Sequence, residues 1–232
     1  MSREFTLEKD LYDNGFNMFN KKKIIIEDGV TVLVGCNGIG KTTLLKQIKE
    51  ELNRNKTPYI RFDNLEDGGA NARSNAGYRD DFEFLATSIQ SSEGENIVMN
   101  MTRLAGKIGE FVRTGIVKSE NPFEMIIKSI ANERTNSKNE KLPNERWILL
   151  DAVDSGLSVD NIVDLKECLF KTILEHNFGN KIYIIVSANE FEMARNEKCF
   201  DVYNGKYLNF KDYEEFRKFI LKSKEWKNKR YK

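Results

Sequence analysis

Runs of apolar residues alternate along the chain with amphipathic stretches. The runs VTVLV (residues 30–34), RWILLD (146–151) and KIYIIVSA (181–188) are almost continuously apolar, which is typical of strands buried on both faces of a parallel sheet. In KTTLLKQIKEELNRN (41–55) and NIVDLKECLFKTILEHN (161–177) the apolar positions recur at helical spacing instead. Because strands and helices alternate, the sequence predicts an α/β fold with a largely parallel sheet flanked by helices.

Shorter elements are predicted towards both ends of the chain. Residues 1–34 read as short strands and turns, in which KKKIIIEDG and VTVLVG indicate two strands around an Asp-Gly turn. We therefore expect N-terminal antiparallel strands beside the main sheet. TPYIRF (57–62) predicts a further strand, and CFDVYNGKYLNF (199–210) predicts a hairpin that turns at Asn-Gly. A charged helix is expected from Asp212.

The middle of the chain is more polar. Residues 64–77 are rich in Gly and Asn and read as a loop. Residues 78–117 read as helical with a break near SSEGEN, and residues 118–145 form either a mobile connection or the end of a helical insertion. The sequence predicts a single domain over residues 1–232, with a helical, variable subdomain at about 64–145.

Composition excludes several classes of protein. Hydrophobic residues make up 40% and charged residues 31% of the chain, and the net charge of +1 gives no global attraction to nucleic acid or membranes. Cys36, Cys168 and Cys199 lack CxxC spacing, which argues against a zinc site or a disulfide framework. Neither a signal peptide nor an apolar run of the ~20 residues that a membrane helix needs is evident. We therefore expect a cytoplasmic protein with no membrane segment.

The strongest chemical signal lies at residues 35–42, GCNGIGKT, which match the phosphate-loop pattern G-x-x-x-x-G-K-[ST] in full. A buried strand enters this loop and an amphipathic helix leaves it, as the pattern requires. Its glycines let successive N–H groups point at phosphate oxygens, and the helix N-terminus adds partial positive charge. We assign Lys41 to the β- and γ-phosphates and the Thr42 hydroxyl to Mg²⁺. The predicted nucleotide-binding residues are Gly35, Cys36, Asn37, Gly38, Ile39, Gly40, Lys41, Thr42 and Thr43.

A second half of the site is expected at Asp151. A Mg²⁺-nucleotide needs a carboxylate at the end of a neighbouring strand, and RWILLD ends in one. The predicted metal ligands are therefore Thr42 and Asp151.

The stretch GxNGxGKTTLL, with Asn37 at its third position, resembles the ATP-binding cassette superfamily. It is more similar to the soluble chromosome-maintenance and recombination-repair ATPases of that superfamily than to P-loop kinases. The resemblance covers most of the chain and is weakest between about 64 and 145. It implies ATP as the nucleotide. SAN at residues 187–189 is only faintly similar to the S-A-K loop of GTPases, and no N-K-x-D follows.

The resemblance places a catalytic glutamate directly after Asp151, where this chain has Ala152. Alanine cannot orient or deprotonate a water molecule. Asp154, three residues after Asp151, is the candidate substitute; alternatively, it caps the helix that starts near Val159 or shapes the turn. Ser155, Gly156 and Leu157 fit the family loop that crosses to the partner subunit.

Further family elements are degenerate. SSEGE (91–95) is a weak match to the signature that covers a γ-phosphate in the other subunit of a dimer, with Ser92 and Gly94 in its key places; a plain helix cap is the alternative. Asn189 stands where the family carries a histidine, and an amide can bind a phosphate or a water molecule without carrying a proton. His176, at the end of a predicted helix, is interpreted as structural.

Two further elements of the family have no clear counterpart in this chain. The family carries a glutamine in a loop after a strand, and Asn64, just beyond YIRFD, is the nearest candidate for it. Tyr12, Phe16 and Phe19 are candidates for stacking on adenine, although each is better suited to the core.

Three functions follow from the resemblance. The first is a slow ATPase that dimerises with ATP and drives a separate effector in a DNA-related or defence-related setting. The second is a nucleotide-binding switch with negligible hydrolysis, and the third is the ATPase subunit of a transporter. The cofactors would be ATP and Mg²⁺. Nucleic acid is a candidate partner, to be contacted by residues 118–145 or by the basic segment around Trp226, which is otherwise a solvated helix end.

Overall fold

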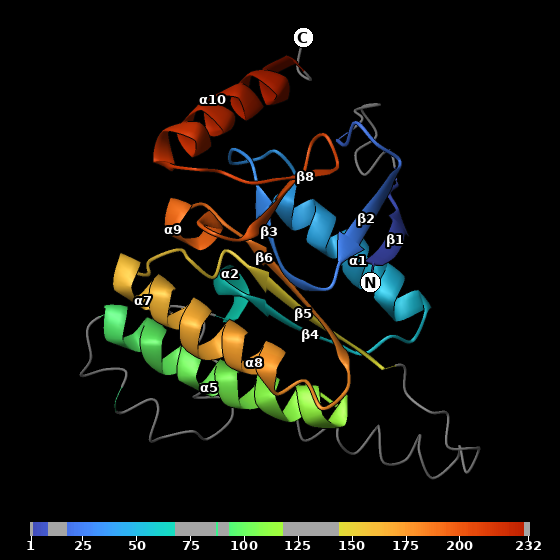
Figure 1. Ribbon diagram of the computed structural model, residues 1–232, viewed down its shortest axis with the longest axis vertical. Helices are drawn as coiled ribbons and strands as arrows, with labels where there is room; N and C mark the ends of the chain where they lie inside the picture. Colours follow the sequence, from blue (N-terminus) through green and yellow to red (C-terminus); the bar gives the residue numbers. More distant parts are fainter. Residues whose placement is uncertain (1, 9–17, 68–86, 88–92, 118–143, 230–232) are drawn as a thin grey trace.

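A six-stranded sheet forms the centre of the molecule (Figure 1). The computed structural model describes residues 2–8, 18–67, 87, 93–117 and 144–229. The strand order is β4-β5-β6-β3-β7-β8, in which all neighbours are parallel except β7 and β8. The predicted, largely parallel sheet is confirmed. Its strands are β3 (Gly29–Val34), β4 (Tyr59–Asp63), β5 (Glu145–Asp151), β6 (Lys181–Ser187), β7 (Lys198–Asp201) and β8 (Lys206–Leu208).

The expected N-terminal antiparallel strands form a separate two-stranded sheet. Strand β1 (Ser2–Thr6) pairs with β2 (Lys23–Glu27), with Phe5 opposite Ile24. Strands β2 and β3 flank the predicted Asp-Gly turn but belong to different sheets. Gly29 has a φ of 93°, which a residue without a Cβ adopts readily, and it redirects the chain between the two sheets.

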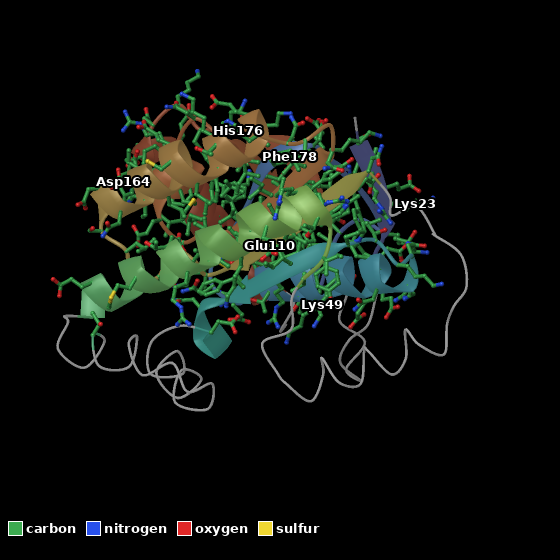
Figure 2. All side chains as sticks on the ribbon, turned by 90° about the horizontal axis from the view of Figure 1, so that it is seen from below. Lys23, Lys49, Glu110, Asp164, His176 and Phe178 are labelled. Carbon is green, nitrogen blue, oxygen red and sulfur yellow. The ribbon has the colours of Figure 1, made fainter. Side chains whose placement is uncertain are left out.

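Helices cover both faces of the main sheet. Helix α1 (Lys41–Arg54) and the β1–β2 sheet lie over one face, whereas α5 (Glu93–Thr114) runs alongside α7 (Val159–Asp164) and α8 (Lys171–Glu175) over the other (Figures 1 and 2). Alternation along β5 explains the two layers, because Trp147 packs into the cluster under α1 while Ile148 packs into the cluster under α5. Burial of both faces accounts for the continuous apolar runs in the sequence.

The helix predicted at residues 161–177 contains an irregularity. It runs from α7 into α8 through a π-helical segment, η1 (Leu165–Phe170). Leu165 and Phe170 at the two ends of η1 are both buried, so the wider turn keeps both side chains on the core face.

Residues 64–67, expected to begin a loop, instead form a short helix, α2 (Asn64–Asp67). The Asp67 carboxylate accepts the backbone N–H of Asp63 at 2.9 Å, a local contact that stabilises a turn of this kind. The rest of the predicted loop, the start of the 78–117 helical region and nearly all of residues 118–145 lie outside the described residues. The single domain with a variable 64–145 subdomain stays a prediction.

The C-terminal elements lie near the end of β3. The hairpin β7–β8 turns through residues 202–205, with Gly205 at φ 60°, as its Asn-Gly signal predicted. Helix α9 (Phe191–Ala194) follows β6, and helix α10 (Tyr213–Lys229) lies near the start of α1 (Figure 1). None of the helices in the described part of the chain combines the length and apolar character that spanning a membrane requires.

Candidate functional site

The phosphate-loop motif occupies the turn between β3 and α1, at the carboxyl end of a central strand. Gly35, Gly38 and Gly40 have φ values of 144°, 77° and 119°, in the region that side chains rarely adopt. A Cβ on Gly35 would lie 2.8 Å from the Ile39 side chain, and one on Gly40 would lie 2.9 Å from the Met18 sulfur. The loop therefore requires glycine for its conformation at all three positions, and for space at Gly35 and Gly40.

An open pocket of about 360 Å³ lies beside this loop. Its size falls within the range of small-molecule sites. The carboxyl ends of β5 and β6 complete its wall, as expected for a ligand site in an open parallel sheet. The lining residues are Met18, Asn37, Gly38, Gly40, Lys41, Thr42, Thr43, Asp151, Ala152, Ser187 and Asn189.

Lys41 is held against the loop. Its Nζ donates to the Gly35 carbonyl at 2.8 Å, and the side chain is buried. Burial lowers the pKa of Lys41, while the nearby Asp154, Cys36 and Asp151 oppose that change. An ammonium group that is only partly hydrated and already sits at the loop needs little rearrangement to reach an anion in the pocket.

Asp151 is oriented by a neighbour from the next strand. The Ser187 hydroxyl, at the end of β6, donates to Asp151 Oδ1 and accepts the Ala152 backbone N–H at 2.8 Å. Strands β5 and β6 are parallel neighbours, so their carboxyl ends meet. Sequence reasoning did not assign Ser187 a role; its place at the end of the next apolar run was the available signal.

Ala152 lines the pocket in the left-handed conformation, with a φ of 52°. This conformation is costly for residues other than glycine and concentrates at functional sites. The methyl side chain offers no acid or base to the pocket.

Asp154 makes contacts that the sequence does not predict. Its side chain is buried, and Oδ2 accepts the backbone N–H groups of Asn189 at 2.6 Å and Glu190 at 2.8 Å. Oδ1 is buried with no hydrogen-bond partner among the described residues. Burial raises the pKa of Asp154, and the N–H groups of Glu190 and Asn189 counteract that rise. The alternative that Asp154 caps α7 is wrong, because the N-cap of that helix is Ser158.

The Asp154 carboxyl therefore fixes the segment that carries Asn189. Asn189 itself is exposed and lines the pocket, so its amide can reach a bound ligand. Asn64 is the first residue of α2, directly after β4, and its Nδ2 donates to the Ser155 carbonyl at 3.1 Å. This bond ties α2 to the loop of Ser155, Gly156 and Leu157, which follows the strand that carries Asp151.

The remaining residues predicted from the sequence lie away from the pocket lining or outside the described residues. Gly94 lies in the first turn of α5, while Ser92 lies outside the described residues, so the signature match stays a prediction. Tyr12 and Phe16 are also outside them, and Phe19 is buried in the core. His176 lies exposed at the end of α8, close to Phe178 (Figure 2), with Nδ1 3.1 Å from the Thr172 carbonyl oxygen.

Two contacts from α10 reach the loop, and the sequence predicts neither of these bonds. Ser223 accepts the Cys36 backbone N–H at 2.8 Å, and Lys227 donates to the Asn37 carbonyl at 3.0 Å. Met18, another pocket residue without an assignment from sequence, contacts the loop at Gly40.

Comparison with known proteins is limited to a weak structural likeness. No family model matches the sequence, and no curated protein matches it significantly. Among solved structures, the chain is similar to a nucleotide-free ATP-binding cassette from an ABC transporter, with 17% sequence identity and a TM-score of 0.43 over 97% of this chain and 99% of that one. A TM-score this low carries no information about the functional site. The roles given to the site residues therefore rest on the phosphate-loop motif and on the pocket.

Proposed function

We propose that the chain binds Mg-ATP in the pocket beside the phosphate loop and hydrolyses it slowly. One observation carries the proposal: a complete phosphate-loop motif is folded between strand and helix, and Lys41, Thr42 and Asp151 line a single pocket with it. Backbone N–H groups, an ammonium and the N-terminus of a long helix converge there, which is the arrangement that binds polyphosphates. ATP is favoured over GTP by the sequence resemblance.

Thr42 and Asp151 would hold Mg²⁺. A hydroxyl and a carboxylate are the oxygen donors that this ion prefers, and the ion keeps several further positions for water and phosphate oxygens. The described residues contain no group of three or more His, Cys, Asp or Glu side chains suited to a metal. This fits a metal that arrives with the nucleotide, for which two protein oxygens suffice. When bound, Mg²⁺ would neutralise charge on the phosphate oxygens.

Slow turnover is proposed because no free general base faces the pocket among the described residues. Ala152 has no acid or base, and the Asp154 carboxylate is buried and bound to the backbone of Asn189 and Glu190. Asn189 would orient a water molecule through its amide, and Lys41 would stabilise the charge on the transferred phosphoryl group. The loss of general-base assistance commonly costs ~10²–10⁴-fold in rate. Asp154 is thus proposed as a positioning residue behind Asn189.

The same observation favours a second candidate, a nucleotide-binding switch with negligible hydrolysis. In that case the bound nucleotide would hold one conformation, and nothing would need to deprotonate water. The two candidates differ only in their rate of phosphate release.

In either case we propose that ATP promotes a homodimer that acts on a separate effector. Ser155 and Gly156 are exposed, as residues that contact a partner subunit must be. Ser92 and Gly94 would reach the nucleotide of the other subunit. A DNA-related or defence-related setting, with nucleic acid as a candidate partner, rests on the sequence resemblance alone.

Steady-state phosphate release tests the enzymatic part. We expect a slow Mg²⁺-dependent rate that Lys41→Ala abolishes and that Lys46→Ala, an exposed lysine on the same helix, leaves intact. A rate unaffected by Lys41→Ala would contradict the proposal, because the activity would then arise elsewhere. Tight Mg-ATP binding with no measurable release would select the switch.

A further inference from the structure

Helix α10 packs on the phosphate-loop end of the molecule through one continuous face. Its inward residues recur at helical spacing, and they are Phe216, Phe219, Ile220, Ser223, Trp226 and Lys227. Trp226 stacks on Tyr203 of the β7–β8 turn, with ring centroids 5.5 Å apart and planes inclined by 20°. Phe216 contacts Phe210 and Phe191 at 5.2 and 5.6 Å. These aromatic contacts, which lie before and after Ser223, fix where this part of the helix meets the loop.

The two polar residues of this face bond consecutive residues of the loop. Ser223 Oγ accepts the Cys36 N–H at 2.8 Å and donates to the Ile220 carbonyl at 2.7 Å, so its single proton is used within α10. Lys227 Nζ donates to the Asn37 carbonyl at 3.0 Å. The lysine stem also lies beside the loop, since a Cβ on Gly38 would be 3.6 Å from it.

These bonds determine which way two peptide units face. The described residues contain no cis peptide bond, so the C=O and N–H of each unit point in opposite directions. In the unit between Gly35 and Cys36, the N–H points at Ser223 and the carbonyl points at Lys41 Nζ, 2.8 Å away. In the unit between Asn37 and Gly38, the carbonyl points at Lys227. The Gly38 N–H therefore points away from Lys227, and Gly38 itself lines the pocket.

We propose that α10 holds the phosphate loop in its anion-receiving conformation, with Ser223 and Lys227 as positioning residues for the polyphosphate of the ligand. This inference rests on the proposed function, because it assumes that the pocket receives a nucleotide. Gly38 has almost no intrinsic preference between positive and negative φ, so the loop alone does not select the orientation of this peptide unit. Without Lys227 the unit is free to turn its carbonyl towards the phosphates, where it would repel them.

The full-length chain and four variants test the proposal by calorimetric titration with Mg-ATP and, separately, with inorganic tripolyphosphate. Lys227→Met removes the donor, and Ser223→Ala removes the acceptor. Each is expected to weaken binding of both ligands by about 5- to 20-fold, the effect of losing a hydrogen bond of this kind. Lys227→Arg should restore binding. Lys224→Met, which removes the same charge from an exposed position of α10, should change binding by less than about twofold.

Amide exchange of Cys36 in the ligand-free chain gives a second readout. Ser223→Ala should accelerate exchange at this amide, and the thermal midpoint of Lys227→Met should match the wild type. If the wild-type chain binds both ligands and neither α10 variant weakens binding, the inference is overturned while the proposed function stands. If the wild-type chain binds neither ligand, the proposed function fails. The inference, which assumes a bound polyphosphate, then falls with it. If the wild-type chain does bind, unchanged exchange at Cys36 in Ser223→Ala also overturns the inference.

Discussion

Asp154 accepts the backbone N–H of Asn189 at 2.6 Å, so a buried carboxyl group holds in place an amide that faces the pocket. The sequence raised the alternative that Asp154 replaces the missing glutamate at position 152 as a general base. In the structure, Asp154 instead fixes the backbone of the segment after β6 by accepting its N–H groups.

Asp154→Asn should lower the stability of the folded chain only slightly, whereas Asp154→Ala should lower it strongly. The asparagine side chain keeps an oxygen that can accept the N–H groups of Asn189 and Glu190, so the free energy of unfolding should change by less than about 1 kcal/mol. The alanine leaves both of these partly buried N–H groups without their carboxylate acceptor, which costs about 1–3 kcal/mol. Denaturant unfolding of the two variants checks this order. A loss of phosphate release of 100-fold or more in Asp154→Asn, with stability retained, would instead identify Asp154 as the base.

The pH dependence of stability should carry the signature of Asp154. Because burial raises its pKa in the folded state above the usual value of 3.8, the folded chain binds this proton more tightly than the unfolded chain does. The contribution to stability is complete below pH 3.8 and is lost as the pH rises through the folded-state pKa. Asp154→Asn removes this titration. Its stability relative to the wild type should therefore improve with rising pH across that window, and a difference that is flat with pH would contradict the assignment.

Ala152→Glu should raise the rate of hydrolysis. Ala152 lines the pocket, so a glutamate at this position adds a carboxylate where water and phosphate meet. If only the base is missing, single-turnover phosphate release should rise by about 10²-fold or more. Ala152→Gln has the same size and cannot accept a proton, and it serves as the control. Equal rates in the two variants would show that something other than a base limits the reaction.

Thiol reactivity should separate the three cysteines. Cys168 is exposed, whereas Cys36 and Cys199 are buried. Burial raises the pKa of the Cys199 thiol to about 12, and nearby Glu197 adds to that rise. Iodoacetamide should therefore modify Cys168 first and leave Cys199 intact in the folded chain. Cys36, within the phosphate loop, should react slowly, and bound Mg-ATP should slow its reaction further. Mass spectrometry of tryptic peptides measures the modification of each cysteine. Rapid modification of Cys199 would contradict its burial in the structure.

Much of the fold could be predicted because its signals are local. The run from Arg146 to Asp151 is largely apolar because β5 is buried on both faces. The loop at Gly35–Lys41 is recognisable because its backbone conformation requires glycine at fixed positions. The short helix α2 was missed because Asn64–Asp67 is polar, lies next to glycines and has no helical periodicity of its own.

The partners of the site residues were harder to predict, because they come from distant parts of the chain. Ser187 meets Asp151 only once β5 and β6 are paired, and a single serine after an apolar run is unremarkable by itself. The contacts of Ser223 and Lys227 join residues almost two hundred positions apart. The sequence around Trp226 is compatible with a solvated helix end or a phosphate contact, whereas the structure shows Lys227, one of the lysines in this segment, bound to the loop.

Calorimetric titration of the wild-type chain with ATP, with and without Mg²⁺, tests the central claim most directly. We expect one site per chain that tightens with Mg²⁺, that Lys41→Met weakens by at least about tenfold, and that Lys46→Met leaves unchanged. Thr42→Val should remove most of the effect of Mg²⁺, since the hydroxyl is its proposed ligand. An absence of saturable binding, or binding that Lys41→Met does not weaken, would contradict the account.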